Sequence, residues 1–293
     1  MQLRWLLLTL LLWLPPLPGE AAQDDVPNCL GCHTVTANVA VHAVFQTVHG
    51  GLGGGGNGSC AGCHGASAEH ARNPAGEMPG VSFGPRWLSA AETRTDTCLG
   101  CHSGGSALHW AGNEHQREGM ACDSCHDSHR QQDPALSETE SQRSCLGCHT
   151  RVQAELLLPS RHPIAEGKTA CGDCHNPHGS LGDASLHQPS VNDNCLQCHQ
   201  DKRGPFLWEH PPVAEDCALC HRPHGAVHDR LLTARGPALC QQCHVAAFHP
   251  SLPYGAEGLA GGSGNQNVLG KNCLNCHSQV HGSNHPSGAR LTR

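Results

Sequence analysis

The chain has 293 residues, of which 20 are cysteine and 25 are histidine, while phenylalanine, tryptophan and tyrosine together number ten. So few aromatic side chains exclude an ordinary enzyme fold built around a large apolar core. The balance of 18 basic against 25 acidic residues, a net charge of −7 at pH 7, argues against a nucleic-acid-binding surface.

The first residues have the pattern of an export signal. Arg4 forms a short basic region, Trp5 to Leu14 is apolar, and small residues follow at 19–21. We expect a signal peptide over 1–21, with an uncleaved anchor as the alternative. The apolar run is about ten residues, too short to span a bilayer as a helix.

Every cysteine belongs to a CXXCH motif, and there are ten such motifs. The cysteine pairs are Cys29/Cys32, Cys60/Cys63, Cys98/Cys101, Cys122/Cys125, Cys145/Cys148, Cys171/Cys174, Cys195/Cys198, Cys217/Cys220, Cys240/Cys243 and Cys273/Cys276. The histidines that follow them are His33, His64, His102, His126, His149, His175, His199, His221, His244 and His277.

CXXCH is the attachment signature of c-type haem. Two thiols one helical turn apart reach the two vinyl groups at one edge of a porphyrin, and the adjacent imidazole ligates the iron from the proximal side. Disulfides or zinc sites would also use paired cysteines. Neither explains a histidine after every second cysteine, so the motifs predict ten covalently bound haem c groups with iron as the metal.

The remaining 15 histidines predict the sixth ligands. Methionine, the other common axial ligand, is almost absent, because only Met78 and Met120 remain beyond the signal segment. Ligation by two histidines is therefore the expectation for most of the haems.

An internal repeat indicates which histidines serve. The motifs form five pairs, and in the middle three pairs one histidine precedes the second motif and another follows it closely: His115 and His129, His162 and His178, His210 and His224. The first pair offers His49 and His70, and the last offers His249, His281 and His285, one more than it needs. Outside this pattern, and expected on the surface, are His42, His109, His187 and His228.

The fold class that follows is a multihaem cytochrome, mostly irregular, with short α-helices and little or no β-sheet. We expect one elongated domain over 22–293, built from five dihaem modules at about 22–90, 91–137, 138–190, 191–233 and 234–293. Capping boxes at Ser89 and Ser137 predict helices before Cys98 and Cys145, and two helical turns are expected over 150–158. Gly50 to Gly58 and Tyr254 to Gly270 have the composition of mobile loops.

Four stretches resemble the MtrA/DmsE family of decahaem cytochromes: 171–180, 202–212, 239–244 and 273–288. The resemblance runs from the first motif to the C-terminus, and the glycine run at 50–58 departs from it. It implies a row of haems with two histidine ligands each, inside an outer-membrane β-barrel porin. The implied distal ligands are the eleven histidines His49, His70, His115, His129, His162, His178, His210, His224, His249, His281 and His285.

The function expected is electron conduction across the outer membrane, between periplasmic cytochromes or quinol-oxidising proteins and extracellular metal, either reducing iron or oxidising Fe(II). An extracellular multihaem cytochrome is a further expected partner. The alternatives are a soluble periplasmic donor to a terminal reductase and a multihaem reductase. A reductase needs an iron with an open position, whereas every motif here ends in histidine, so we expect an electron carrier and not an enzyme.

Overall fold

The computed structural model describes residues 28–34, 41–244, 272–286 and 288–292. The signal peptide expected over 1–21, the glycine-rich stretch 254–270 and the candidate ligand His249 lie outside the described residues. What is described falls into two compact units that divide between Ser89 and Ala90. The five module boundaries stay predictions.

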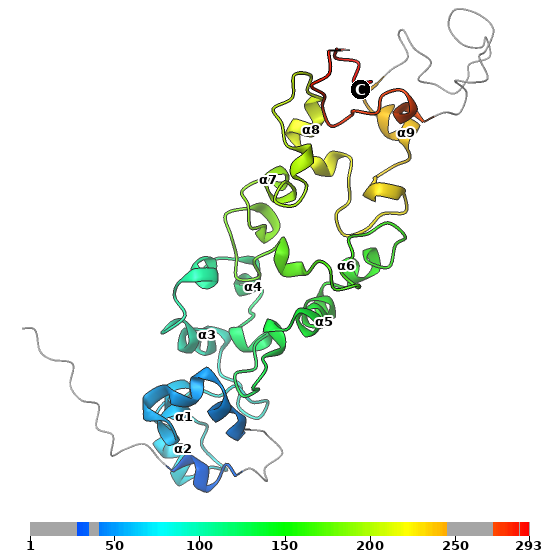
Figure 1. Cartoon of the computed structure of the whole chain (residues 1–293). Helices are drawn as coiled ribbons and strands as arrows, with labels where there is room; N and C mark the ends of the chain where they lie inside the picture. Colours follow the sequence, from blue (N-terminus) through cyan, green and yellow to red (C-terminus); the bar gives the residue numbers. More distant parts are fainter. Residues whose placement is uncertain (1–27, 35–40, 245–271, 287, 293) are drawn as a thin grey trace, which may run out of the picture. The chain divides into compact units, whose positions relative to one another are not determined.

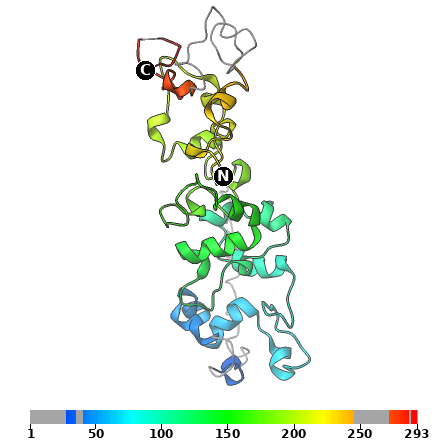
Figure 2. The ribbon, with the colours of Figure 1, turned by 90° about the vertical axis from the view of Figure 1, so that its right-hand side faces the viewer.

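The described elements are short α-helices and 3₁₀-helices joined by irregular segments (Figures 1 and 2). The α-helices are α1 Asn57–His64, α2 Ala68–Arg72, α3 Ala91–Leu99, α4 Glu114–Arg117, α5 Glu138–Cys148, α6 Thr150–Glu155, α7 Val191–Cys195, α8 Pro211–Glu215 and α9 Gly236–Cys240. The 3₁₀-helices are η2 Cys29–Gly31, η3 Val41–Gln46, η4 Val48–Gly54, η5 Gly105–His109, η6 Cys122–Ser124, η7 Pro134–Leu136, η8 Cys171–Asp173, η9 Asp183–Ser185, η10 Gln200–Lys202, η11 Cys217–Leu219, η12 Asp229–Leu231 and η13 Cys273–Asn275.

The CXXCH motifs use both kinds of helix, in a regular order. In the second unit, the first motif of each pair begins at the end of an α-helix (α3, α5, α7 and α9), and the second motif begins with a 3₁₀ turn (η6, η8, η11 and η13). In the first unit the order is reversed, because η2 carries the first motif and α1 the second. The two members of a pair also contact each other in α1 with η2, α3 with η6, α7 with η11 and α9 with η13.

Capping residues explain part of this difference. Ser137 and Ser190 lie just before α5 and α7, and each hydroxyl accepts a hydrogen bond from the backbone N–H three residues on. The 3₁₀ turns η11 and η13 instead follow Asp216 and Asn272, whose side chains accept from the N–H only two residues on. The predicted cap at Ser137 is thereby confirmed, and the turns expected over 150–158 begin as α6.

Two sequence expectations are wrong. Ser89 does not cap α3, which follows Ala90; the Ser89 hydroxyl accepts a hydrogen bond from the Ser82 amide instead. The glycine run is not a loop throughout, since 50–58 contributes to η4 and to the start of α1, although Leu52 and Gly53 within η4 have non-helical φ/ψ angles. Its mobility stays a prediction. The Ser59 hydroxyl bonds to the Gly50 and Leu52 carbonyls. A Cβ on Gly53 or Gly58 would collide with the other residue's backbone, so glycine here permits close packing.

The described residues contain only isolated antiparallel bridges and no sheet, which confirms the expectation of short helices with little or no β-structure. Their buried apolar side chains are few: Trp110, Ala121, Leu156, Ala226 and Leu291. No helix in the described part of the chain has both the length and the hydropathy to cross a membrane. Hydrogen bonds and ion pairs also join the elements; one ion pair links buried Arg94 of α3 to Asp123 of η6.

Candidate haem-binding site

Among the described residues, seven CXXCH histidines each face one of the predicted distal histidines across a nearly constant gap. The ring centroids are 5.9 to 6.2 Å apart in the pairs His33–His70, His149–His115, His126–His178, His199–His162, His175–His224, His244–His210 and His221–His281. An iron bound by two imidazoles at about 2 Å each separates the two ring centres by about 6 Å. The spacing therefore fits a haem iron held between the two rings of each pair.

Hydrogen bonds orient these rings through one nitrogen. The Nδ1–H of eight histidines donates to a backbone carbonyl at 2.6 to 2.9 Å: His64, His70, His115, His162, His175, His210, His221 and His277. A donor at Nδ1 fixes the tautomer in which Nε2 carries the free lone pair. The residues present thus fit a metal ligand at Nε2.

Two other histidines are oriented by carboxylates. The Nδ1 of His126 lies 2.6 Å from Asp133 Oδ2, and the Nδ1 of His224 lies 3.2 Å from Glu155 Oε2. Partial burial opposes ionisation of Asp133, but the hydrogen bonds from His126 and from two backbone amides outweigh it and hold the pKa of this carboxyl below its ordinary value.

The pairs of the second unit cross between neighbouring repeats. His115, His162 and His210 each face the first CXXCH histidine of the next repeat. In the opposite direction, His178, His224 and His281 each face the second CXXCH histidine of the preceding repeat. Each of these haem positions is therefore lined by residues from two repeats.

A recurring junction holds the crossing histidines together. The Nδ1 of His115 donates to the carbonyl of Pro177, the residue before His178. His162 bonds in the same way to Pro223, the residue before His224. The last junction repeats the arrangement with His210 and the Val280 carbonyl, one residue before His281. Two ligands that belong to different predicted haems are thus fixed relative to each other.

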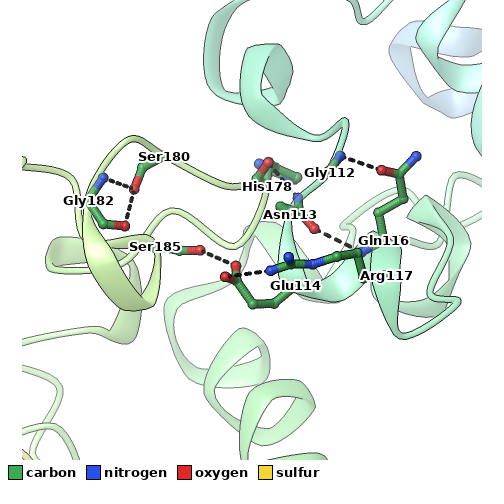
Figure 3. Close-up of polar contacts among 9 residues, drawn as sticks. All are labelled: Gly112, Asn113, Glu114, Gln116, Arg117, His178, Ser180, Gly182 and Ser185. Atoms are coloured by element: carbon green, nitrogen blue, oxygen red, sulfur yellow. Dashed lines mark hydrogen bonds and ion pairs between the residues drawn. The ribbon is translucent and has the colours of Figure 1, made fainter.

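The first of these junctions also shows how local structure supports the contact (Figure 3). Asn113 precedes α4, where its side-chain oxygen accepts from the Gln116 amide while its Nδ2 donates to the His178 carbonyl at 2.7 Å. Glu114 reaches the Ser185 hydroxyl at 3.3 Å and Arg117 at 3.1 Å. One capping side chain therefore both starts a helix and holds the segment that carries the next repeat's ligand.

The residue after each backward-facing ligand is glycine, because the chain passes very close to the preceding repeat. A Cβ on Gly179 would collide with the His109 carbonyl, one on Gly225 with the Glu155 carbonyl, and one on Gly282 with the Phe206 ring. Gly179 and Gly282 also have positive φ angles of 99° and 125°. These glycines position the distal histidines.

Burial favours the neutral form of the same three ligands. Desolvation lowers the pKa of His178, His224 and His281 below the ordinary histidine value, although the Glu155 carboxylate opposes the shift at His224. Neutral imidazole is the form that binds iron.

The cysteines continue the pairing. Within each motif pair the two first cysteines lie within hydrogen-bonding reach of each other: Cys29 and Cys60, Cys98 and Cys122, Cys145 and Cys171, Cys195 and Cys217, Cys240 and Cys273. Between repeats of the second unit the second cysteines interact electrostatically: Cys125 with Cys148, Cys174 with Cys198, and Cys220 with Cys243. The attachment points of the last eight motifs therefore follow one another without interruption.

The other four second cysteines belong to the first three motifs and the last one: Cys32, Cys63, Cys101 and Cys276. Cys63 is half-buried at the end of α1, one turn after Cys60 of the same motif, whereas Cys101 follows α3 and Cys276 follows η13, and both are exposed. The electrostatic interactions between second cysteines of successive repeats therefore run from Cys125 to Cys243. The ten motifs themselves extend further, from Cys29 to Cys276. Haem attachment at each individual cysteine stays a prediction from its motif.

Other histidines lie elsewhere. His42 and His187 direct Nε2, the nitrogen an iron would need, to the carbonyls of His33 and Gly172. His228 joins Leu232 in a backbone bridge, and His109 contributes its carbonyl to the contact with Gly179. His49, His129, His249 and His285 stay predicted distal ligands, and the CXXCH histidines His64, His102 and His277 stay predicted proximal ligands.

Comparisons with known proteins agree with this chemistry. Residues 162–204 and 210–248 match the doubled CXXCH motif family, and residues 60–148 match the NrfB-like family of cytochrome c-type proteins. The chain is also 42% identical over 281 residues to the multihaem cytochrome MtrA of Shewanella baltica (strain OS185), which covers 94% of this chain and 83% of that protein.

The chain belongs to the MtrA family of multihaem cytochromes. Its CXXCH motifs bind haem c covalently, and it is an electron-transfer protein rather than an enzyme. The likeness to MtrA that the sequence indicated is thereby confirmed.

Sequence reasoning missed several residues that position the ligands. Asp133 and Glu155 are single acidic residues with no motif around them, and only the fold brings them to His126 and His224. Glycine after a distal histidine was visible in the repeated CHxPHG sequence, although its role was not. That recurrence was the signal that could have identified Gly179 and Gly225.

Proposed function

We propose that the chain binds ten haem c groups, each iron between two histidines, and conducts electrons across the outer membrane inside a porin. The conduction joins periplasmic electron carriers to extracellular metal, in either direction. Bound haems supply a one-electron Fe(III)/Fe(II) couple, and electrons tunnel between neighbours at rates that fall steeply with distance. The chain's own part is to fix the spacing and close the coordination positions.

The uninterrupted succession of attachment points carries this proposal. The first cysteines lie within hydrogen-bonding reach within each pair. The second cysteines interact electrostatically between repeats from Cys125 to Cys243. The crossing histidines reinforce that spacing, because each junction fixes two ligands through one backbone carbonyl. This construction supports electron passage along the repeats without any reaction at a substrate.

Histidine ligands on both sides of each iron favour electron conduction over catalysis at a haem. Each of the seven facing pairs provides two imidazoles, so neither side of an iron held there is left for a substrate. The proposed distal set is the one named from the sequence, with one histidine in excess. Histidine, and not methionine, on both sides also favours a low reduction potential.

The proposed location and partners are an exported, periplasmic protein held at the outer membrane by a β-barrel porin, with periplasmic and extracellular cytochromes as exchange partners. The acidic chain, at −7 before any haem propionates are counted, favours basic patches on those partners. The resemblance of the sequence to the MtrA/DmsE family supports this assignment.

The test is purification of the native protein from detergent-solubilised envelopes, with a haem count and identification of associated proteins. We expect ten haems per chain and a stoichiometric porin. A cytochrome that is released in the periplasmic fraction without any porin would instead establish the soluble donor role.

Spectroscopy of the same preparation tests the ligands. Low-spin ferric signals from all haems, and no binding of carbon monoxide to ferrous iron, are expected. A high-spin signal from one haem in the resting protein would contradict ligand saturation and favour a reductase.

A further inference from the structure

Two described histidines differ from eight others in the group that orients the ring. Eight described histidines donate Nδ1–H to a neutral backbone carbonyl, whereas His126 and His224 face the carboxylates of Asp133 and Glu155. The comparison is close at the CXXCH histidines. His175 and His221 use the carbonyls of Ala184 and Arg230, where His126 uses Asp133.

We propose that Asp133 and Glu155 lower the reduction potentials of the haems bound at His126 and His224. This rests on the proposed ligation of iron by those histidines. A carboxylate at Nδ1 makes the imidazole a more basic ligand. Ferric iron carries one more positive charge than ferrous iron, so added negative charge stabilises the oxidised state more.

Asp133 is held firmly for this role. It is 16% exposed, and its Oδ1 accepts hydrogen bonds from the Ala135 amide at 3.0 Å and the Asp127 amide at 3.3 Å. Its Oδ2 is thereby aimed at His126. The partner ring of this pair, His178, has a buried Nδ1 with no acceptor among the described residues, so Asp133 supplies the hydrogen-bonded charge at this position.

Glu155 has the weaker effect of the two. Its contact with His224 is longer, at 3.2 Å against 2.6 Å. Its other oxygen lies 3.4 Å from the Nε of Arg151, whose opposite charge partly compensates it. On the other side of the iron, His175 is oriented by a neutral carbonyl. The reduction potential of the haem at His126 is therefore lowered more than that of the haem at His224.

The resulting sequence of potentials along the second unit is uneven. Counted from the N-terminus, the haem of the fourth motif has the carboxylate-oriented His126 as its proximal ligand, and the haem of the sixth motif has the carboxylate-oriented His224 as its distal ligand. The CXXCH histidine of the eighth motif, His221, is oriented by a neutral carbonyl. Electrons entering the repeats therefore fill the fourth and sixth positions last.

The test uses the full holoprotein and the substitutions Asp133→Asn, Glu155→Gln and Glu138→Gln. Asparagine and glutamine keep an oxygen acceptor of similar shape and remove only the charge. Glu138 is exposed at the start of α5 and provides a matched loss of one negative charge away from a ligand. A potentiometric titration, monitored by optical absorbance and by EPR of the low-spin ferric haems, measures the change in the haem reduction potentials.

In Asp133→Asn we expect one haem in ten to move from the low-potential end of the titration to higher potential, with the EPR g values of that haem altered. Glu155→Gln should shift one haem by less, and Glu138→Gln should leave the titration unchanged. Equal profiles for the wild type and Asp133→Asn, with low-spin spectra intact, would overturn the proposal.

A high-spin haem in Asp133→Asn would also overturn it at this position, because it would show that the carboxylate only holds the ring in place. Glu155→Gln then gives an independent measurement. A wild-type protein without low-spin signatures typical of two histidine ligands would instead refute the proposed ligation itself, so the two failures are distinguishable.

Discussion

The two units of the chain both carry CXXCH motifs, but the order of 3₁₀ turn and α-helix within a motif pair is reversed between them. In the first unit, the opening motif lies on the 3₁₀ turn η2 and the next on α1; in the second unit, α-helix always precedes 3₁₀ turn. CXXCH therefore does not dictate its own backbone conformation. Residues before the motif decide it, such as a serine cap for α5 and α7, or a side chain that closes a short turn for η11 and η13.

The units also differ in where a distal ligand comes from. In the first unit His33 faces His70, and both belong to that unit. In the second unit the facing histidines come from adjacent repeats. The residue after His70 is Ala71, whereas the residue after His178 and His224 is glycine. A side chain with a Cβ is tolerated after the ligand supplied within the unit and after the ligands that face the next repeat, His115, His162 and His210. Only the ligands that face the preceding repeat, such as His178 and His224, are followed by a glycine at a close approach of the backbones.

Removing one haem from each unit gives the largest expected difference in the free energy of unfolding. The change is Cys29→Ser with Cys32→Ser in the first unit, against Cys171→Ser with Cys174→Ser in the second. The second loss removes a link between two repeats, which we expect to cost about 2–5 kcal/mol, the scale of a lost covalent cross-link. The first should cost less. Thermal unfolding of the two proteins, each with nine haems by mass, measures this, and equal losses would contradict the comparison.

Replacing a distal ligand tests the pairing directly. His70→Ala and His224→Ala should each convert one haem in ten to a form that binds carbon monoxide when reduced, because one side of the iron is then open. His187→Ala is the control, since its Nε2 already bonds to the Gly172 carbonyl. Carbon monoxide difference spectra give the count. An unchanged spectrum in His224→Ala would show that the ring does not bind iron.

A methyl group on the glycine beside a crossing ligand should destabilise the second unit. Gly225→Ala places a Cβ against the Glu155 carbonyl, and we expect a loss of about 1–3 kcal/mol in the free energy of unfolding. Gly104→Ala is the matched control, because its φ is −130° and no atom lies within 4 Å of the added Cβ. Denaturant titration of both proteins tests this. Equal midpoints would contradict the requirement for close approach.

The smallest losses in the free energy of unfolding are expected from two helix-capping side chains, Asn113 at the first junction and Ser137 before α5. Asn113→Ala removes the cap of α4 and the hydrogen bond to the His178 carbonyl, at a cost of about 1–2 kcal/mol. Ser137→Ala removes the cap of α5 and a contact with the Thr139 hydroxyl, but no contact between repeats, and should cost about 1 kcal/mol or less. Hydrogen exchange at the Gln116 and Glu140 amides reads out each cap separately. A larger loss from Ser137→Ala than from Asn113→Ala would show that the junction contact adds no stability.

Much of the site could be predicted because its chemistry is local. The thiols and the following histidine are fixed by a five-residue motif, and the spare histidines stand at recurring distances from it. The class of fold followed from the same facts, since a chain with ten aromatic residues needs another source of apolar surface. The failures at Ser89 and at the glycine run arose where a tertiary or close backbone contact replaced the local preference.

The sequence by itself determined how many CXXCH motifs exist, which histidine ends each motif, and which other histidines are available as ligands. Only the tertiary structure decided that His178 faces His126 and that His115 faces His149, because those contacts depend on how the chain returns between repeats. It also decided that Asp133 and Glu155 reach two of the ligands. Covalent attachment needs only neighbours along the chain, whereas ligand pairing and electrostatic tuning act through space.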